Sequence, residues 1–233
     1  MIHSVTSPKN SLMAAFRNCV RHLACVVVAG FMLMPIASSP SHAATKIQRL
    51  VSPGGIEAWF VQDATVPLIA MEYAFSGGAA QDPADKPGVS NLVSDVLDEG
   101  SGDLDSKTFH ERLERRAIEL SFSSSRDYFR GSLRMLKDTK DEAFDLLRMS
   151  LTSPHFASED VERIRSQVIS GLQSDTASPS ALAGRKFLQM AFGDHPYGRP
   201  SNGTLESVPT ITAADLRDYV TRVLAKEIGR AHV

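Results

Sequence analysis

The sequence predicts an α+β fold in which helices cover a largely antiparallel sheet. Short segments of β-branched and aromatic residues come in neighbouring pairs, as strands of hairpins do. Longer segments with apolar residues every three or four positions, typical of amphipathic helices, follow each group of strands. The resulting order of hairpins, helices, hairpin and helices favours pairing between strands that are close in sequence, and such pairs are antiparallel.

The first part of the chain contains three strands and two helices by this reasoning. The predicted elements are strands 47–51, 56–61 and 68–75, helix 89–97, and a helix 106–116 with Ser106 as candidate N-cap. A Ser-Pro-Gly-Gly turn at 52–55 separates the first two strands. Val89, Leu92 and Val96 give the first helix its apolar face.

The second part begins with another strand pair and continues as helices. The predicted elements are strands 118–124 and 128–135, helices 140–151, 158–172 and 178–192, and a last helix capped by Thr212. In the second of these strands Phe129, Leu133 and Met135 alternate with polar residues, and Gly131 falls in the same apolar row. This strand should therefore bury one face.

The composition excludes several classes of protein. The 233 residues are 42% hydrophobic and 22% charged, which is the balance of an ordinary globular chain and not of a disordered, collagen-like or multi-span membrane protein. The net charge is −2, so no basic surplus is available to neutralise phosphates. We therefore expect no nucleic-acid partner.

The first 43 residues have the pattern of a secretory signal peptide. Residues 1–22 carry three basic residues and no acid, the uncharged apolar run 23–36 follows, and small residues lead to Ala43 and Ala44. We place cleavage between these two alanines. A run of fourteen residues is short for a membrane span, so we expect no stable anchor and a periplasmic or secreted protein. Both cysteines, Cys19 and Cys25, leave with the leader, so the mature chain has no thiol chemistry.

Several segments in order resemble the insulinase-like (pitrilysin, M16) zinc peptidases. They are Tyr-Ala-Phe-Ser-Gly-Gly at 73–78, Pro-Gly-Val-Ser-Asn-Leu-Val-Ser-Asp-Val-Leu at 87–97, Leu-Ser-Phe-Ser-Ser-Ser-Arg-Asp at 120–127, and Phe-Gly-Asp-His-Pro-Tyr-Gly at 192–198. The resemblance covers nearly all of residues 46–225 and corresponds to the first domain of such subunits. It implies the family's α+β fold for residues 44–226.

The same resemblance implies that the zinc site is degenerate. Active members carry His-x-x-Glu-His on the first helix, where two histidines bind Zn²⁺ and the glutamate acts as general base; a distal glutamate completes the ligand set. These positions correspond to Asn91 and Asp95 for the histidines, Ser94 for the general base, and Ser170 or its neighbour for the distal glutamate. One carboxylate among them does not hold a catalytic zinc, so we expect no catalytic residue, no metal ligand set and no cofactor here.

Other polar residues are weaker candidates. His110 and Glu114 share a helical face and form a conceivable metal pair, although an exposed contact is the simpler interpretation. We interpret His155 and His195 as loop residues.

The resemblance implies a non-catalytic, exported subunit that assists an active, zinc-bearing M16-type partner in degrading peptides. One alternative is a structural or binding protein on the same fold without a protease partner, and another is an active zinc peptidase with unusual ligands. Such subunits carry a second, similar domain, so we expect the chain to be truncated. Residues 227–233, which a common sequencing adaptor read in frame can encode, are predicted to be a non-native tail.

Overall fold

The computed structural model describes residues 46–63 and 65–224, which form parts of two compact units. The predicted leader, its cleavage site at Ala43 and Ala44, and the tail 227–233 lie outside the described residues. The first unit contributes a hairpin of β1 (Ile47–Val51) and β2 (Glu57–Val61), whose strands pair antiparallel with Ile47 opposite Val61. Every residue of both strands is exposed, including Trp59 at 77%.

The second unit contains a three-stranded antiparallel sheet. Its strands are β3 (Leu68–Ser76), β4 (Glu119–Ser124) and β5 (Tyr128–Leu136), in the order β3-β5-β4. Burial alternates along β5, as the sequence predicted, because Phe129, Leu133 and Met135 point toward the helices. Gly131 stands opposite Tyr73 in this row, and a Cβ there would lie 2.1 Å from the Tyr73 ring. The glycine therefore leaves room for the tyrosine.

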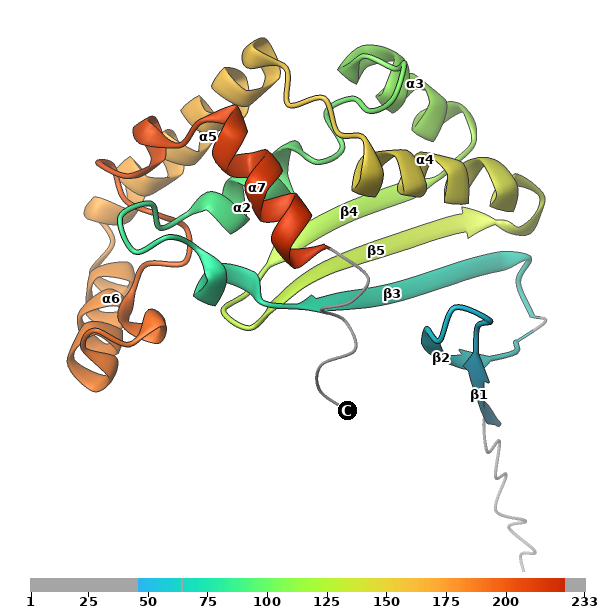
Figure 1. Cartoon of the computed structure of the whole chain (residues 1–233), viewed down its shortest axis with the longest axis horizontal. Coiled ribbons are helices and arrows are strands. Elements are labelled where there is room, and N and C mark those ends of the chain that lie inside the picture. The colour runs from blue at the N-terminus through green and yellow to red at the C-terminus, as the bar shows by residue number, and fades with distance from the viewer. Residues whose placement is uncertain (1–45, 64, 225–233) are drawn as a thin grey trace, which may run out of the picture. The chain divides into compact units, whose positions relative to one another are not determined.

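The helices of this unit lie mainly on one side of the sheet (Figure 1). They are α2 (Val89–Val96), α3 (Ser106–Arg115), α4 (Lys140–Thr152), α5 (Ser158–Thr176), α6 (Pro179–Phe192) and α7 (Ala213–Val223). Within the described ranges, no helix is both long enough and apolar enough to cross a membrane. The α+β class, the antiparallel sheet and the helical layer confirm the fold predicted from the sequence.

Two apolar clusters form the core between the sheet and the helices. One joins α2, α5 and α7 to Phe129 of β5, and its fully buried members include Leu92, Val93 and Tyr219. The other joins α3 and α4 to β4 and β5 around Phe109 and Leu146. Because α2 is buried along most of its length, its few accessible positions are held in place firmly.

The cap of α3 corrects one prediction. Asp105, not Ser106, is the N-cap, because its carboxylate accepts the Thr108 backbone N–H at 2.8 Å. The Ser106 hydroxyl donates to Glu99 instead, at 2.5 Å. The prediction for α7 is confirmed, since Thr212 caps it in a reciprocal capping box with Asp215.

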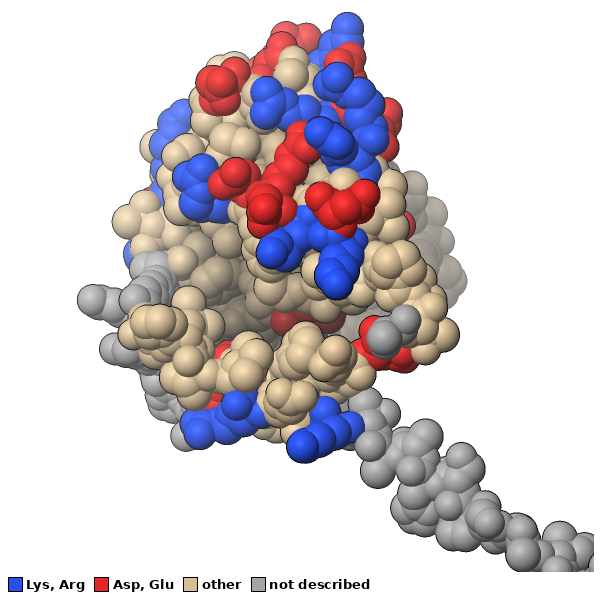
Figure 2. Space-filling model, turned by 90° about the vertical axis from the view of Figure 1, so that its right-hand side faces the viewer, with Lys and Arg blue, Asp and Glu red and all other residues tan. Residues whose placement is uncertain are grey.

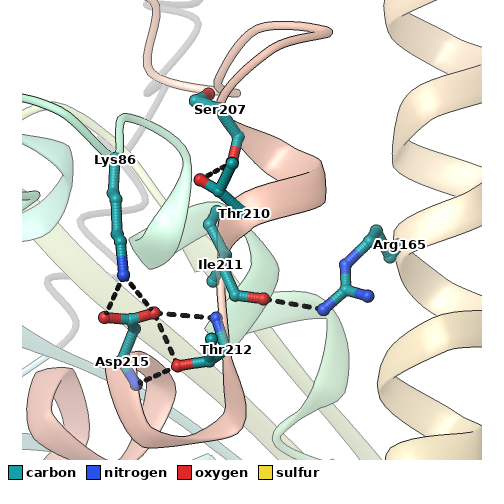
Figure 3. A network of polar contacts seen from close by, with 7 residues as sticks. All are labelled: Lys86, Arg165, Ser207, Thr210, Ile211, Thr212 and Asp215. Carbon is teal, nitrogen blue, oxygen red and sulfur yellow. Dashed lines mark hydrogen bonds and ion pairs between the residues drawn. The ribbon is translucent and has the colours of Figure 1, made fainter.

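Long-range polar contacts tie α7 to the neighbouring elements (Figure 3). Lys86, in the loop before α2, donates to both carboxylate oxygens of Asp215 at 2.8 Å. Arg165 of α5 donates to the Ile211 carbonyl at 2.7 Å. These contacts hold the segment before α7 between α2 and α5.

The charged surface over α3 and α4 has no single sign. Figure 2 shows Lys and Arg interspersed with Asp and Glu in the upper part of this face. Arg116 pairs with Glu142 at 2.7 Å, and Arg148 lies 3.5 Å from Asp145. This face offers no broad basic field for a polyanion.

Candidate functional site

A buried carboxylate fixes the start of α2. Asp82 is 5% exposed and accepts the backbone N–H groups of Gly88 and Ser90 at 2.8 and 2.9 Å. Burial raises the pKa of Asp82 to about 6, against the lowering effect of these hydrogen bonds. Gly88 adopts φ 100°, and a Cβ there would lie 2.7 Å from Gly203. The close approach of the two glycine backbones sets where the helix begins.

The side of α2 that faces the pocket carries Asn91, Ser94 and Asp95, whose hydrogen bonds run largely within the helix. The Asn91 amide donates to the Asp95 carboxylate at 3.1 Å. The Ser94 hydroxyl donates to the Asn91 carbonyl at 2.7 Å, and Ser94 is 5% exposed. No base contacts Ser94 through these hydrogen bonds, so nothing here activates its hydroxyl as a nucleophile.

These residues form one wall of an open pocket of about 600 Å³ between α2, α5 and β4. Polar side chains dominate near α2, whereas the α5 wall combines apolar side chains with Gln167 and Asp175. The lining residues are Asn91, Ser94, Asp95, Asp98, Ser121, Phe122, Ile164, Gln167, Val168, Gly171, Leu172, Asp175 and Asn202.

Of the positions predicted for the distal glutamate, Ser170 and its neighbour, Gly171 lines the pocket. Ser170 is exposed, its hydroxyl donates to the Ser166 carbonyl of its own helix, and it is not part of the pocket wall. Gly171, the next residue, does line the pocket. Side chains of neighbouring residues in an α-helix point about 100° apart. A shift of one residue in the alignment with the family, which the sequence leaves open, therefore changes which side chain faces α2.

Burial at the pocket raises the pKa of two carboxyl groups, those of Asp95 and Asp98. Partial desolvation between the walls raises the pKa of Asp95 to about 6, and the nearby charge of Asp98 acts in the same direction. Burial likewise raises the pKa of Asp98, while His110 and Arg163 oppose this shift.

A second cluster lies just beyond the end of α2, around Glu99. Arg163 of α5 contacts the Glu99 carboxylate at 2.6 Å, and the His110 ring nitrogen lies 3.5 Å from the same oxygen. Burial would raise the pKa of Glu99, but hydrogen bonds from Arg163 and Ser106 hold it below its usual value. The residues border an open cavity of about 500 Å³. Sequence reasoning missed this cluster, because Glu99 and Arg163 meet only through the fold.

The contacts of His110, His155 and His195 differ from the metal pair considered from the sequence. His110 faces Glu99, so the contact found for its ring is not the predicted one to Glu114. His195 accepts the Tyr197 backbone N–H at 3.2 Å and caps a short 3-10 turn, in keeping with its interpretation as a loop residue. His155 lies 2.6 Å from the Gly102 carbonyl. Among residues 46–63 and 65–224 no three His, Cys, Asp or Glu side chains group closely enough to hold a metal ion.

The family model that matches this chain is insulinase (peptidase family M16), over residues 62–205. The chain belongs to this family. The match begins at the end of the hairpin and includes α2, α5 and the pocket between them.

One relative of this chain is named a non-peptidase homolog, and another is named a zinc protease. The chain is 29% identical over 158 residues to the "non-peptidase homolog YmxG" of Helicobacter pylori, covering 68% of this chain and 37% of that protein. It is 25% identical to an "uncharacterized zinc protease" of Mycobacterium leprae, covering 75% of this chain and 39% of that one. The chain therefore spans about two fifths of the length of these relatives.

Solved structures give the same picture of the fold. A "peptidase M16 inactive domain" from Pseudomonas fluorescens superposes with a TM-score of 0.73 at 26% identity, covering 77% of this chain and 44% of that one. A protease from Helicobacter pylori superposes with a TM-score of 0.67 at 17% identity, which supports the fold alone.

The pocket residues do not fit the family's zinc. Zn²⁺ in proteins takes imidazole, thiolate or carboxylate ligands, usually four in number with water included. The wall offers the amide of Asn91, the carboxylate of Asp95, and at Gly171 no side chain at all. The general-base position holds Ser94, whose hydroxyl cannot take a proton from water at neutral pH. We therefore derive no catalytic step through a metal.

Proposed function

We propose that this chain is part of a non-catalytic, exported M16-type subunit that assists an active zinc-bearing partner in degrading peptides. The observation that carries this proposal is the pocket between α2 and α5, whose residues fit no catalytic zinc. The Helicobacter protein named a non-peptidase homolog and the Pseudomonas domain described as inactive support it. Other relatives have names that call them zinc proteases, so the proposal rests on the residues of the pocket and not on the family.

The outer edge of β4 is the place where we propose that a peptide binds. In the described part of the chain β4 pairs with β5 alone, so backbone groups on its other edge are free to pair with an extended segment. Ser121 and Phe122 of this strand also line the pocket. A peptide added to this edge would run past the pocket and place alternate side chains toward it.

Zinc content tests the non-catalytic assignment. The full chain should retain no stoichiometric zinc after dialysis at neutral pH, and the triple variant Asn91→His, Asp95→His, Gly171→Glu should bind one zinc per chain. Nothing lies within 4 Å of a Cβ added at Gly171, so the glutamate can be accommodated. One zinc per wild-type chain would overturn the proposal.

A matched variant tests the register of α5. The second triple variant carries Ser170→Glu in place of Gly171→Glu. It has the same two histidines and one glutamate, but the glutamate is at an exposed position that does not line the pocket. We expect it to bind zinc at least about tenfold more weakly, because even the loss of an outer-shell partner of a metal ligand costs about 10–100-fold in affinity. Equal affinity of the two triples would show that the assignment of the distal position to residue 171 is wrong.

Partnership and export need separate measurements. Adding the chain to an active M16-type partner should raise peptide cleavage, and unchanged cleavage would contradict the assisting role. Capture from native extract should retrieve a zinc peptidase; retrieval of unrelated proteins alone would favour a structural or binding role.

N-terminal sequencing tests export. The sequence of the exported protein should begin at Ala44, and a chain that begins at Met1 would contradict cleavage of the leader.

A further inference from the structure

One side of α6, which we call its outer face, is exposed and largely apolar. Among the α-helices of the described residues, α6 alone contains no buried residue. Phe187 and Met190 are 67% and 76% exposed, and Leu182 is 46% exposed. In Figure 1 the helix lies at the edge of the second unit, away from the sheet. The outer face consists of Leu182, Ala183, Lys186, Phe187, Met190 and Ala191, all of them exposed.

This exposure does not come from a loosely held helix. The Ser178 hydroxyl accepts the Ala181 backbone N–H at 3.4 Å, and Pro179 occupies the first helical position, where its fixed backbone angle suits a helix. At the other end the Phe192 ring packs edge-on against Tyr197, with 5.4 Å between the ring centroids. Both ends of α6 are therefore held, and the outer face between them is a preformed surface.

The outer face has the spacing of a helix-packing surface. Its residues form two neighbouring rows with a spacing of four, which are Leu182, Lys186 and Met190 in one row and Ala183, Phe187 and Ala191 in the other. Rows with this spacing are the ridges that pack into the grooves of a second helix. Gly184 lies beside the second row, and nothing lies within 4 Å of a Cβ added there. A glycine inside an exposed helix lowers the stability of the helix, whereas in a packed face it lets another backbone approach closely.

The charge on α6 has one sign. Arg185 and Lys186 are its only charged residues, and residues 178–193 include no acid. Among the described residues Lys186 donates to the Gln189 side-chain oxygen at 3.4 Å and has no ion pair, and Arg185 has neither kind of contact. Lys186 lies one turn from Met190, within the outer face. A partner that covers this face therefore meets an unpaired cation, which an acid on the partner would complement.

These observations disfavour two other occupants. A second copy of this chain that used the same face would place basic residues against basic residues, because α6 has no acid. A helix that lies in a membrane surface has a wide apolar face with basic residues on the opposite, polar face, whereas Lys186 lies inside one of the two rows here. A helix of another chain fits the ridges, the space at Gly184 and the charge together.

We infer that the outer face of α6 binds an amphipathic helix of another protein, whose apolar side packs on the two rows and whose carboxylates lie beside Lys186 and Arg185. This inference rests on the proposed function, because that function requires a partner subunit, and it adds the surface at which the partner binds. The residues of the outer face are not among those that line the pocket between α2 and α5. The two surfaces can therefore be tested separately.

Fluorescence anisotropy with three labelled peptides tests the inference on the full chain. Each peptide is an eighteen-residue amphipathic helix with leucine and alanine on one side, and the positions that border this side hold glutamate, glutamine or lysine. The chain should bind the glutamate peptide about tenfold more tightly than the lysine peptide at low salt, with the glutamine peptide between them. This preference should shrink as salt is added, because the charges are exposed. Equal binding of the three peptides would overturn the inference.

Variants locate the binding surface. Lys186→Glu should remove the preference for the glutamate peptide, whereas Lys107→Glu on α3, whose side chain is 85% exposed, makes the same charge change elsewhere and should preserve it. Phe187→Ser removes the largest side chain of the outer face and should weaken all three peptides at least about tenfold. Gly184→Leu fills the space beside the second row without a clash inside the chain, so it should also weaken binding. Thermal unfolding checks that each variant is folded.

Other outcomes would overturn the inference in distinguishable ways. Self-association in analytical ultracentrifugation that Phe187→Ser abolishes would assign the outer face to a second copy. Sedimentation with phosphatidylglycerol vesicles and not with phosphatidylcholine vesicles, lost in the same variant, would assign it to a lipid surface.

The cleavage assay with an active M16-type partner separates this inference from the proposed function. If wild type raises cleavage and Phe187→Ser raises it equally, the inference fails and the proposed function stands. If wild type itself has no effect, the assisting function fails, and the inference that rests on it fails as well. We expect wild type to raise cleavage and Phe187→Ser to lose most of this increase.

Discussion

Two carboxylates at the end of α2, only four residues apart, have opposite environments. Asp95 opens into the pocket toward α5, where its one side-chain hydrogen bond comes from Asn91 and its neighbouring charge is Asp98. Glu99 is more buried, yet it accepts hydrogen bonds from Arg163 and Ser106 and lies beside His110. The pKa of Asp95 rises to about 6, whereas the pKa of Glu99 falls.

The difference shows that burial by itself does not determine the charge state of a carboxylate. Desolvation raises the pKa of both groups, and the presence or absence of a cation decides the outcome. The Glu99 cluster is therefore a structural contact that joins α2, α3 and α5.

The largest expected effect comes from breaking the Glu99 cluster. Glu99→Gln removes the charge that faces Arg163 and should lower the free energy of unfolding by about 2 kcal/mol at pH 7. This loss is smaller than that expected for a fully buried ion pair, because the Arg163 side chain is 44% exposed. Urea denaturation measures it. Glu111→Gln, on the exposed face of α3, should change stability by less than about 0.5 kcal/mol. If the two variants change the free energy of unfolding equally, the Glu99 cluster stabilises the fold no more than an exposed ion pair does.

The ion pair of Glu99 and Arg163 should stop contributing to the free energy of unfolding at acidic pH. The pKa of Glu99 is lower in the folded state than its ordinary value of 4.5, so its stabilisation is present above that value and disappears as the pH falls through the folded pKa. The stability difference between wild type and Glu99→Gln should therefore shrink below about pH 4. A difference that stays constant to pH 3 would contradict the ionic origin of the effect.

A smaller effect, of opposite sign, is expected in the pocket. Gly171 lies within α5 with nothing within 4 Å of an added Cβ, so Gly171→Ala should stabilise the protein by about 0.5–1 kcal/mol. Gly131→Ala is the matched control, because its Cβ would meet Tyr73, and it should destabilise by about 1–2 kcal/mol. Thermal unfolding compares them, and a loss of stability in Gly171→Ala would show that this glycine has a packing role.

The smallest expected effect is that of Asp95→Asn. The pKa of Asp95 is higher in the folded state than its ordinary value of 3.8, so the folded state keeps its full stability while this carboxyl group is protonated, below that value, and loses part of it as the pH rises through about 6. Asparagine does not ionise, so the variant should melt about 1–2 °C above wild type at pH 7.5 and at the same temperature near pH 4. A gain in melting temperature that increases as the pH falls would contradict a raised pKa of Asp95.

The sequence by itself determined the class of the fold and nearly all of its elements. Alternation along β5 and apolar spacing along α2 report which side of each element is buried, because burial selects one face of a strand or helix. The family resemblance rested on short segments and is confirmed by the match over residues 62–205. The signal peptide, the tail and the absence of zinc stay predictions.

Only the tertiary structure decided which side chains meet. The partners of Glu99 are distant in sequence, and the choice between Ser170 and Gly171 depends on how α5 is rotated about its axis against α2. Ser106 was the predicted cap of α3, but its hydroxyl donates to Glu99, and Asp105 caps the helix instead. Periodicity records burial along one element, whereas contacts between elements depend on packing at the scale of a single residue, which a one-dimensional pattern does not contain.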